Sequence, residues 1–176
     1  EPFLALHEDL VRAAYANYVV ELLDRFMAEQ NTGRAEFNLL VHTLERLCTE
    51  SDPRLVARYY EMELLGLAGF APSLHQCAVG QEEIEPCDQF FSPADGGIIC
   101  PQHHTGLDRS IPLSLNTLKV LRYMQSRAWD AVSVLQLSTP LHRELEQLML
   151  VYITYLLEQR LQSVDFINRL RREEID

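Results

Sequence analysis

The chain has 176 residues, 47% of them hydrophobic, and a formal net charge of −11 at pH 7. This length and composition fit one compact domain (1–176) with a single substantial core and a small inserted module. Because nucleic-acid binding depends on neutralising phosphates, an acidic chain whose only lysine is Lys119 is unsuited to tight, non-specific binding of DNA or RNA. No apolar run reaches the roughly 18 residues that a membrane span needs, so we expect no membrane partner.

Three amphipathic helices are predicted in the N-terminal part of the chain. Apolar residues recur at the helical period over 3–28, which predicts one long helix that ends in the polar stretch 29–33. A second helix carries its apolar stripe over 37–47. A third begins near Pro53, a residue favoured in the first helical turn, and ends at Gly69.

Residues 72–112 differ in composition from both flanks and form an inserted, loop-rich module. The segment is rich in proline and glycine, and nothing in it sustains a helical period. Two short β-prone runs, 89–92 and 97–100, are joined by the sequence Pro93-Ala94-Asp95-Gly96. This pattern predicts a β-hairpin.

Helices resume after the insert. Ser114 is the expected N-cap of one helix, and a shorter helix follows around Trp129. Pro140 opens the last long helix, and a short terminal helix is expected around Phe166 and Leu170. The predicted fold class is therefore mostly α: a bundle of about six helices with an inserted, small zinc-ribbon-like β-hairpin module.

The insert holds three of the four cysteines of the chain. Zinc ribbons use two turns, each of which supplies two ligands about three residues apart. The sequence Cys100-Pro-Gln-His103 fits one such turn. The other begins at Cys77, but Gly80 stands where its partner is expected, and Cys87 is the only other thiol of the insert. The candidate ligands of a structural zinc ion are therefore Cys77, Cys87, Cys100 and His103.

Two other interpretations of the insert stay open. The hairpin could keep its shape without metal, through packing of the apolar pairs 90–91 and 98–99. Alternatively, Cys77 and Cys87 could form a disulfide.

Signatures of catalysis are missing from the sequence. There is no glycine-rich nucleotide-binding motif, no HExxH and no GxSxG. Glu82, Glu83 and Glu85 lie near the cysteines, but we interpret them as a solvated acidic loop and not as general bases beside a catalytic zinc. We therefore expect no enzymatic activity, and a zinc-dependent enzyme or regulator on a helical scaffold is the alternative.

Four segments in chain order carry a family pattern. They read AYANY followed by ELLDRF (14–26), RYYEMELLGLAGFAP (58–72), FSP with GG and a cysteine (91–100), and YL followed by RL, Ser and Phe (155–166). Together they resemble the C-terminal domain of RecO, the bacterial recombination mediator. The resemblance covers nearly the whole chain.

The resemblance implies a non-enzymatic, cytoplasmic role in DNA repair and recombination. RecO-like proteins anneal complementary strands and, with the partner RecR, help to load the recombinase onto single strands coated by the single-stranded-DNA-binding protein. The family's N-terminal OB-fold, which carries much of the contact with single-stranded DNA, would precede Glu1, and we expect it to be missing from this chain. Members with metal use two Cys-x-x-Cys pairs, from which Gly80 and His103 depart, so the ligand positions carry over directly only to Cys77 and Cys100.

The helical domain of this family is implicated in partner contacts. The tail of the single-stranded-DNA-binding protein is acidic and ends in hydrophobic residues, so it requires an apolar pocket flanked by Arg or Lys. Two groups of cations are candidates for this role: Lys119, Arg122 and Arg127, and near the C-terminus Arg169, Arg171 and Arg172.

Overall fold

The computed structural model describes residues 3–27, 33–106 and 110–173, with side chains described as far as residue 158. These residues form seven helices and a three-stranded antiparallel sheet, which confirms the mostly helical class and the small β module. The elements are α1 (Ala5–Glu8), α2 (Leu10–Met27), α3 (Arg34–Thr49), α4 (Pro53–Leu67), β1 (Gln89–Ser92), β2 (Gly97–Ile99), β3 (Ile111–Leu113), α5 (Leu115–Ser126), α6 (Trp129–Val132) and α7 (Thr139–Glu173). No helix within the described ranges is long and apolar enough to span a membrane.

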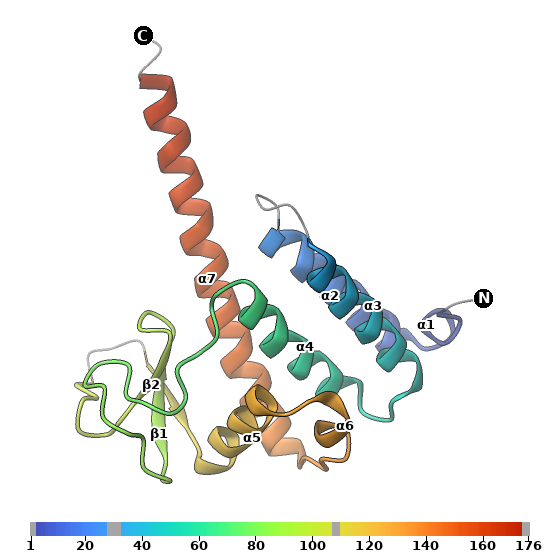
Figure 1. The fold of residues 1–176 in the computed structure, drawn as a ribbon, viewed down its shortest axis with the longest axis horizontal. Helices are drawn as coiled ribbons and strands as arrows, with labels where there is room; N and C mark the ends of the chain where they lie inside the picture. The colour runs from blue at the N-terminus through green and yellow to red at the C-terminus, as the bar shows by residue number, and fades with distance from the viewer. Residues whose placement is uncertain (1–2, 28–32, 107–109, 174–176) are drawn as a thin grey trace.

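Helix α4 is the centre of the helical part. It contacts α2, α3, α5 and α7, and ten of its fifteen residues are buried. Its start agrees with the prediction: Pro53 occupies the first turn, and the Asp52 carboxylate accepts hydrogen bonds from the backbone N–H groups of Arg54 (3.1 Å) and Leu55 (3.2 Å). Figure 1 shows α4 between the α2–α3 pair and α7.

The N-terminal helix is interrupted, so the prediction of one helix over 3–28 is wrong. Asp9 has an extended backbone and separates α1 from α2. Its carboxylate accepts hydrogen bonds from the N–H groups of Val11 (2.9 Å) and Arg12 (3.2 Å), and it therefore caps the start of α2. A short carboxylate competes in this way with continuation of a helix, which apolar periodicity does not reveal. Residues 28–32, where the predicted helix was to end, lie outside the described residues.

The C-terminal helices α5 and α7 begin where the sequence predicted. Ser114 caps α5, because its hydroxyl accepts a hydrogen bond from the N–H of Thr117 at 3.2 Å. Helix α7 runs without interruption to Glu173, so the expected separate helix around Phe166 is part of α7. After Pro140 the sequence of α7 contains neither glycine nor proline, the residues that most often end a helix.

The predicted hairpin is confirmed, and a third strand joins it. Strands β1 and β2 pair antiparallel with Phe90 opposite Ile99. Strand β3 lies on the other side of β1, with Pro112 opposite Phe90. Sequence reasoning missed β3 because it is three residues long and contains a proline, which an edge strand tolerates.

The insert and the helices share one hydrophobic core. Leu74, Phe91 and Ile98 of the insert are at most 1% exposed and belong to the same cluster of buried residues as the helices. Tyr152 of α7 contacts the edge of the Phe91 ring, and its hydroxyl donates a hydrogen bond to the carbonyl oxygen of Phe70 at 3.0 Å. The insert is therefore packed against the α7 side of the bundle, as Figure 1 shows.

Candidate metal centre

The turn at Cys100 has the form that the sequence predicted. The backbone N–H groups of His103 and His104 both donate hydrogen bonds to the carbonyl oxygen of Cys100, at 3.0 and 3.1 Å. The tight turn places the His103 imidazole beside the sulfur of Cys100, with Nδ1 and Sγ 3.2 Å apart. Two ligand types three residues apart are thus held on one local turn.

A second turn runs from Cys77 to Glu82. The N–H of Gln81 donates to the carbonyl oxygen of Cys77 at 2.9 Å, and the N–H of Cys77 donates to the carbonyl oxygen of Glu82 at 2.8 Å. Gln81 has a φ of 67°, which lies in the left-handed region that non-glycine residues seldom adopt. This reversal of the chain brings Glu82 back to Cys77.

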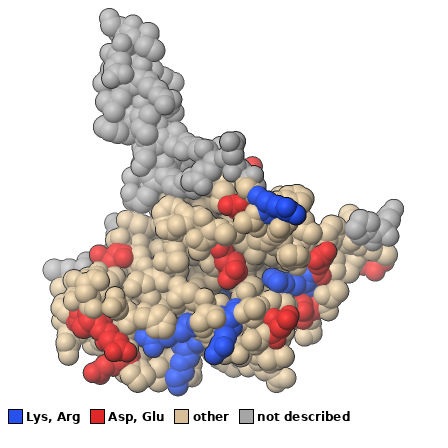
Figure 2. All heavy atoms as spheres, in the orientation of Figure 1, with Lys and Arg blue, Asp and Glu red and all other residues tan. Residues whose placement is uncertain are grey.

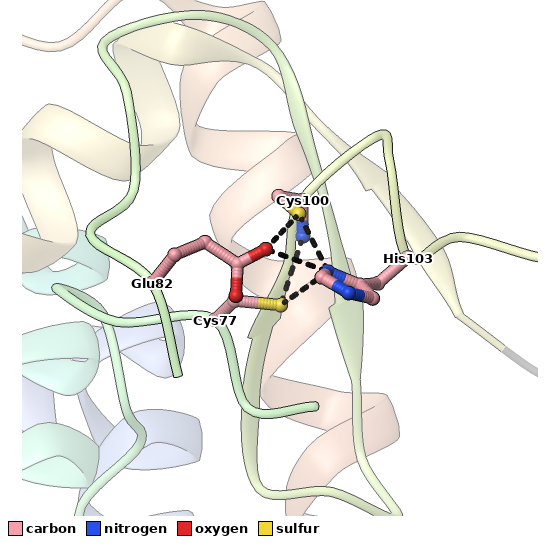
Figure 3. Close-up of side chains that lie close together, drawn as sticks. All are labelled: Cys77, Glu82, Cys100 and His103. Carbon is pink, nitrogen blue, oxygen red and sulfur yellow. Dashed lines mark hydrogen bonds and ion pairs between the residues drawn. The ribbon is translucent and has the colours of Figure 1, made fainter. Parts of the chain in front are cut away.

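The two turns bring four donor groups together, as Figure 3 shows. One ligand atom each from Cys77, Glu82, Cys100 and His103 lies within 4.8 Å of the other three. The Nδ1 atom of His103 is 3.7 Å from the Cys77 sulfur and 2.7 Å from Glu82 Oε1, and the Cys100 sulfur is 3.3 Å from the same oxygen. Around a tetrahedral zinc ion the donor atoms are separated by about 3.3–3.8 Å, and the three distances that involve a sulfur, 3.2–3.7 Å, are close to this range. The nitrogen and oxygen of His103 and Glu82 are closer, at the distance of a hydrogen bond, and would have to separate around an ion.

The backbone also favours a thiolate at Cys77. Its sulfur accepts hydrogen bonds from the N–H groups of Gly80 and Cys100, both at 3.5 Å. Burial alone raises the pKa of this thiol, but the backbone hydrogen bonds outweigh burial and hold the pKa below its ordinary value. For Cys100 burial is the largest influence, and the hydrogen bond to Glu82 adds to it, so the pKa of this thiol is raised.

Three of the four predicted ligands meet in this group, and Cys87 does not. The Cys87 side chain is exposed, and its sulfur accepts a hydrogen bond from Nε2 of Gln89 at 3.0 Å. Each of the four cysteines, all within the described residues, is a free thiol, so the alternative of a Cys77–Cys87 disulfide is wrong. The fourth member of the group is Glu82, which we interpreted from the sequence as part of a solvated acidic loop, because polar acidic loops are usually solvated.

The predicted cations on and just after α5 differ in their surroundings: one contacts the insert and two are exposed. Arg122 faces the insert: its guanidinium donates hydrogen bonds to the carbonyl oxygens of Leu74 (2.9 Å) and Ile84 (3.3 Å). Lys119 and Arg127 are exposed. Figure 2 shows Lys and Arg side chains gathered on the lower part of this face, next to a group of acidic side chains. The side chains of the other three predicted cations, Arg169, Arg171 and Arg172, lie outside the described part.

A second feature, which the sequence did not indicate, is an apolar cavity between α2 and α7. It has a volume of about 450 Å³ and is lined by Leu10, Val11, Ala14, Tyr15, Tyr18, Arg58, Glu146 and Leu150. No linear motif could have found it, because the lining comes from three helices. Leu150 also lines two neighbouring cavities along α7.

A buried polar cluster lies beside this cavity. Arg58 is 6% exposed and forms an ion pair of 2.7 Å with Glu61, whose carboxylate also accepts a hydrogen bond of 2.5 Å from the Tyr18 hydroxyl. Among the described residues, the Nε atom of Arg58 has no hydrogen-bond partner. Burial raises the pKa of Glu61 to about 7, although Arg58 and Tyr18 act in the opposite direction.

Comparison with known proteins assigns the family. The family model "Recombination protein O C terminal" matches residues 7–165. The chain is 32% identical over 176 residues to the DNA repair protein RecO of Dehalococcoides mccartyi, and the aligned region covers 99% of this chain and 69% of that protein. It is 34% identical to the RecO of Roseiflexus sp. (97% and 60%) and 35% identical to that of Moorella thermoacetica (97% and 64%). The resemblance in the four sequence segments is thus confirmed, and the chain belongs to the RecO family, in which it corresponds to the C-terminal region of recombination protein O.

Proposed function

We propose that this chain acts in bacterial recombination repair as a cytoplasmic, non-enzymatic interaction domain. Its partners are the single-stranded-DNA-binding protein and RecR, and these contacts support strand annealing and loading of the recombinase. Membership of the RecO family, whose relatives are named DNA repair proteins, supports the role in repair. The net charge of −11 favours protein partners over direct binding to a polyanion.

The observation that carries the proposal is the cavity between α2 and α7. An acidic peptide tail that ends in hydrophobic residues needs an apolar pocket with a cation near its carboxylates. Leu10, Leu150 and the neighbouring apolar side chains provide the pocket. The charged residues of its lining are Arg58, whose guanidinium is paired with Glu61, and Glu146. We therefore place the tail of the single-stranded-DNA-binding protein in this cavity.

The test is a titration of this chain with a fluorescent peptide ending in that tail, read by fluorescence anisotropy. Leu150→Asp should weaken binding about tenfold or more, because burying a leucine contributes about 1.5–3 kcal/mol. Leu150 is 58% exposed, so the variant should melt like the wild type. Val134→Asp is the matched control, since Val134 is 74% exposed and lies on none of the cavities described above.

The same titration separates the cavity from the predicted cations on α5. In the double variant Lys119→Ala/Arg127→Ala the cavity is intact, so the peptide should bind within about twofold of the wild type. Loss of peptide binding in this variant, with normal binding by Leu150→Asp, would contradict the cavity as the binding site and would indicate that the peptide binds at Lys119 and Arg127.

For the insert we propose a structural zinc ion held by Cys77, Cys100 and His103. Zinc supplies a crosslink between the two turns, whose donor atoms already lie within 4.8 Å of each other. Elemental analysis of the purified chain should give about one zinc per chain. Removal by a chelator should accelerate amide hydrogen exchange in the insert much more than in α4, because α4 is held by apolar packing.

A further inference from the structure

We infer that Glu82 is the fourth ligand of this metal site, in the place that a cysteine at position 80 would take in a regular Cys-x-x-Cys turn. The inference rests on the proposed structural zinc and specifies its donor set as two thiolates, one imidazole and one carboxylate. Three independent observations support it: the backbone pairing of the turn from Cys77 to Glu82, the space at Gly80, and the contacts of the Glu82 carboxylate.

The backbone pairing places Glu82 on the same side as Cys77. Gln76 and Glu83 form an antiparallel bridge, and next to it the N–H of Cys77 donates to the carbonyl oxygen of Glu82 at 2.8 Å. Cys77 and Glu82 are therefore opposite each other, and opposite residues of an antiparallel pair project to the same face. Side chains alternate along a strand, so Glu83 projects to the other face. The backbone pairing therefore places Glu82, and not Glu83, on the same face as the Cys77 sulfur.

Gly80 provides the space that the Glu82 carboxylate occupies. A Cβ atom at position 80 would lie 2.1 Å from Glu82 Oε2 and 2.2 Å from Cε1 of His103, distances that real Cβ atoms essentially never show. A side chain at position 80 would therefore require the ends of the Glu82 and His103 side chains to move. The glycine that breaks the Cys-x-x-Cys pattern leaves room for the observed position of the carboxylate at this corner of the site.

The contacts of Glu82 reach the turn of Cys100 and His103. Its Oε1 atom lies 2.7 Å from Nδ1 of His103 and 3.3 Å from the sulfur of Cys100. Cys87, the remaining thiol of the insert, contacts Gln89 instead. Structural zinc sites use mainly sulfur and nitrogen, so a carboxylate in the fourth position should bind zinc more weakly than a third thiolate. The side chains of Glu82 and His103 are each 38% exposed, so solvent reaches the ion from this side.

The experiment measures zinc affinity of the full chain by competition with a chromophoric chelator, and the absorption of bound Co²⁺ as an independent readout. Glu82→Ala and Glu82→Gln should each lower zinc affinity about tenfold or more, since loss even of groups outside the ligand set costs 10–100-fold. Glu83→Ala and Cys87→Ser are matched controls and should bind zinc like the wild type. Circular dichroism verifies that each variant is folded.

A gain-of-ligand variant makes the opposite prediction. In Gly80→Cys/Glu82→Ala the carboxylate no longer blocks position 80, and a third thiolate joins the site once the His103 ring shifts away from the new Cβ atom. Zinc affinity should rise above that of the wild type, and the thiolate-to-Co²⁺ charge-transfer band should strengthen because three thiolates replace two. The single variant Gly80→Ala should bind zinc more weakly than the wild type, because its methyl group displaces Glu82.

The outcomes separate the inference from the proposal on which it rests. Wild-type protein that binds no zinc at micromolar concentration overturns both the structural zinc and the role of Glu82. Wild-type protein that binds one zinc, with Glu82→Ala and Glu82→Gln binding it equally well, overturns only the role of Glu82. A tenfold loss in Cys87→Ser with no loss in the Glu82 variants would assign the fourth position to Cys87 instead.

Discussion

The helices and the insert are stabilised in different ways. In the helical part, one element is surrounded by others: ten residues of α4 are buried, and α2, α3, α5, α6 and α7 contact it. The insert has only three short strands, and one side of it faces the shared core through residues such as Phe91 and Ile98. The insert also carries the four donor groups on two turns, and two of them, Cys77 and Cys100, belong to the same buried cluster.

The two regions should therefore respond differently to substitutions. Repeated apolar contacts distribute the stability of the helices over many side chains, so that single losses lower the stability of the whole domain. The turns of the insert depend on a few hydrogen bonds, each of which fixes the backbone at one position. We expect substitutions in the helices to act globally and substitutions in the insert to act locally.

The largest expected effect is in the helical core. Leu64 on α4 is completely buried, so Leu64→Ala should lower the free energy of unfolding by about 3 kcal/mol. Denaturant unfolding followed by circular dichroism measures this loss. Leu67→Ala, at an exposed position of the same helix, is the control and should cost much less. Equal losses in the two variants would contradict the central position of α4.

The pH dependence of stability should also originate in the helices. The pKa of Glu61 is about 7 in the folded chain and 4.5 ordinarily, so the folded chain keeps a proton that the unfolded chain loses. Its contribution to stability is complete below pH 4.5 and is lost as pH rises through 7, by about 3 kcal/mol. Glu61→Gln should flatten this slope, measured as the free energy of unfolding from pH 5 to 8.

The exposed Glu45 on α3 offers the control for this measurement. Glu45→Gln should leave the slope unchanged. If Glu61→Gln keeps the full wild-type slope, then the buried cluster of Tyr18, Arg58 and Glu61 is not its source.

The connection between the two regions should be intermediate in strength. Arg122→Ala removes both guanidinium hydrogen bonds to the insert and leaves the carbonyl oxygens of Leu74 and Ile84 without this donor. We expect a loss of about 1–2 kcal/mol, with faster hydrogen exchange in the insert. Lys119→Ala, an exposed cation on the same helix, should change stability by less than about 0.5 kcal/mol. Unchanged exchange in Arg122→Ala would show that α5 does not hold the insert.

The smallest effect is expected at the N-terminal end of α2. Asp9→Ala removes the two capping hydrogen bonds to Val11 and Arg12 and should cost about 1 kcal/mol. Glu8→Ala is the control, because Glu8 is exposed and precedes the cap. Thermal unfolding of the two variants measures the difference, and a cost in Glu8→Ala as large as in Asp9→Ala would argue against capping.

Much of the fold could be predicted from local pattern. The start of α4 at Pro53, the cap at Ser114 and the hairpin of β1 and β2 each depend on residues within a few positions of one another. The prediction failed where a side chain competed with periodicity, as at Asp9, or where the signal was very short, as in β3. The turn at Cys100 and His103 was also predictable, because both ligands belong to one turn.

The class of fold, the family and three of the four groups at the candidate metal site could be found from the sequence, because they depend on short-range spacing and on the order of segments. Contacts between distant segments were needed to show that Glu82 and not Cys87 completes the group, and that α2, α4 and α7 line an open cavity. The physical reason is the same in both cases. Which side chains meet depends on backbone pairing and on the space left by neighbours such as Gly80, and neither is encoded in the spacing of ligands along the chain.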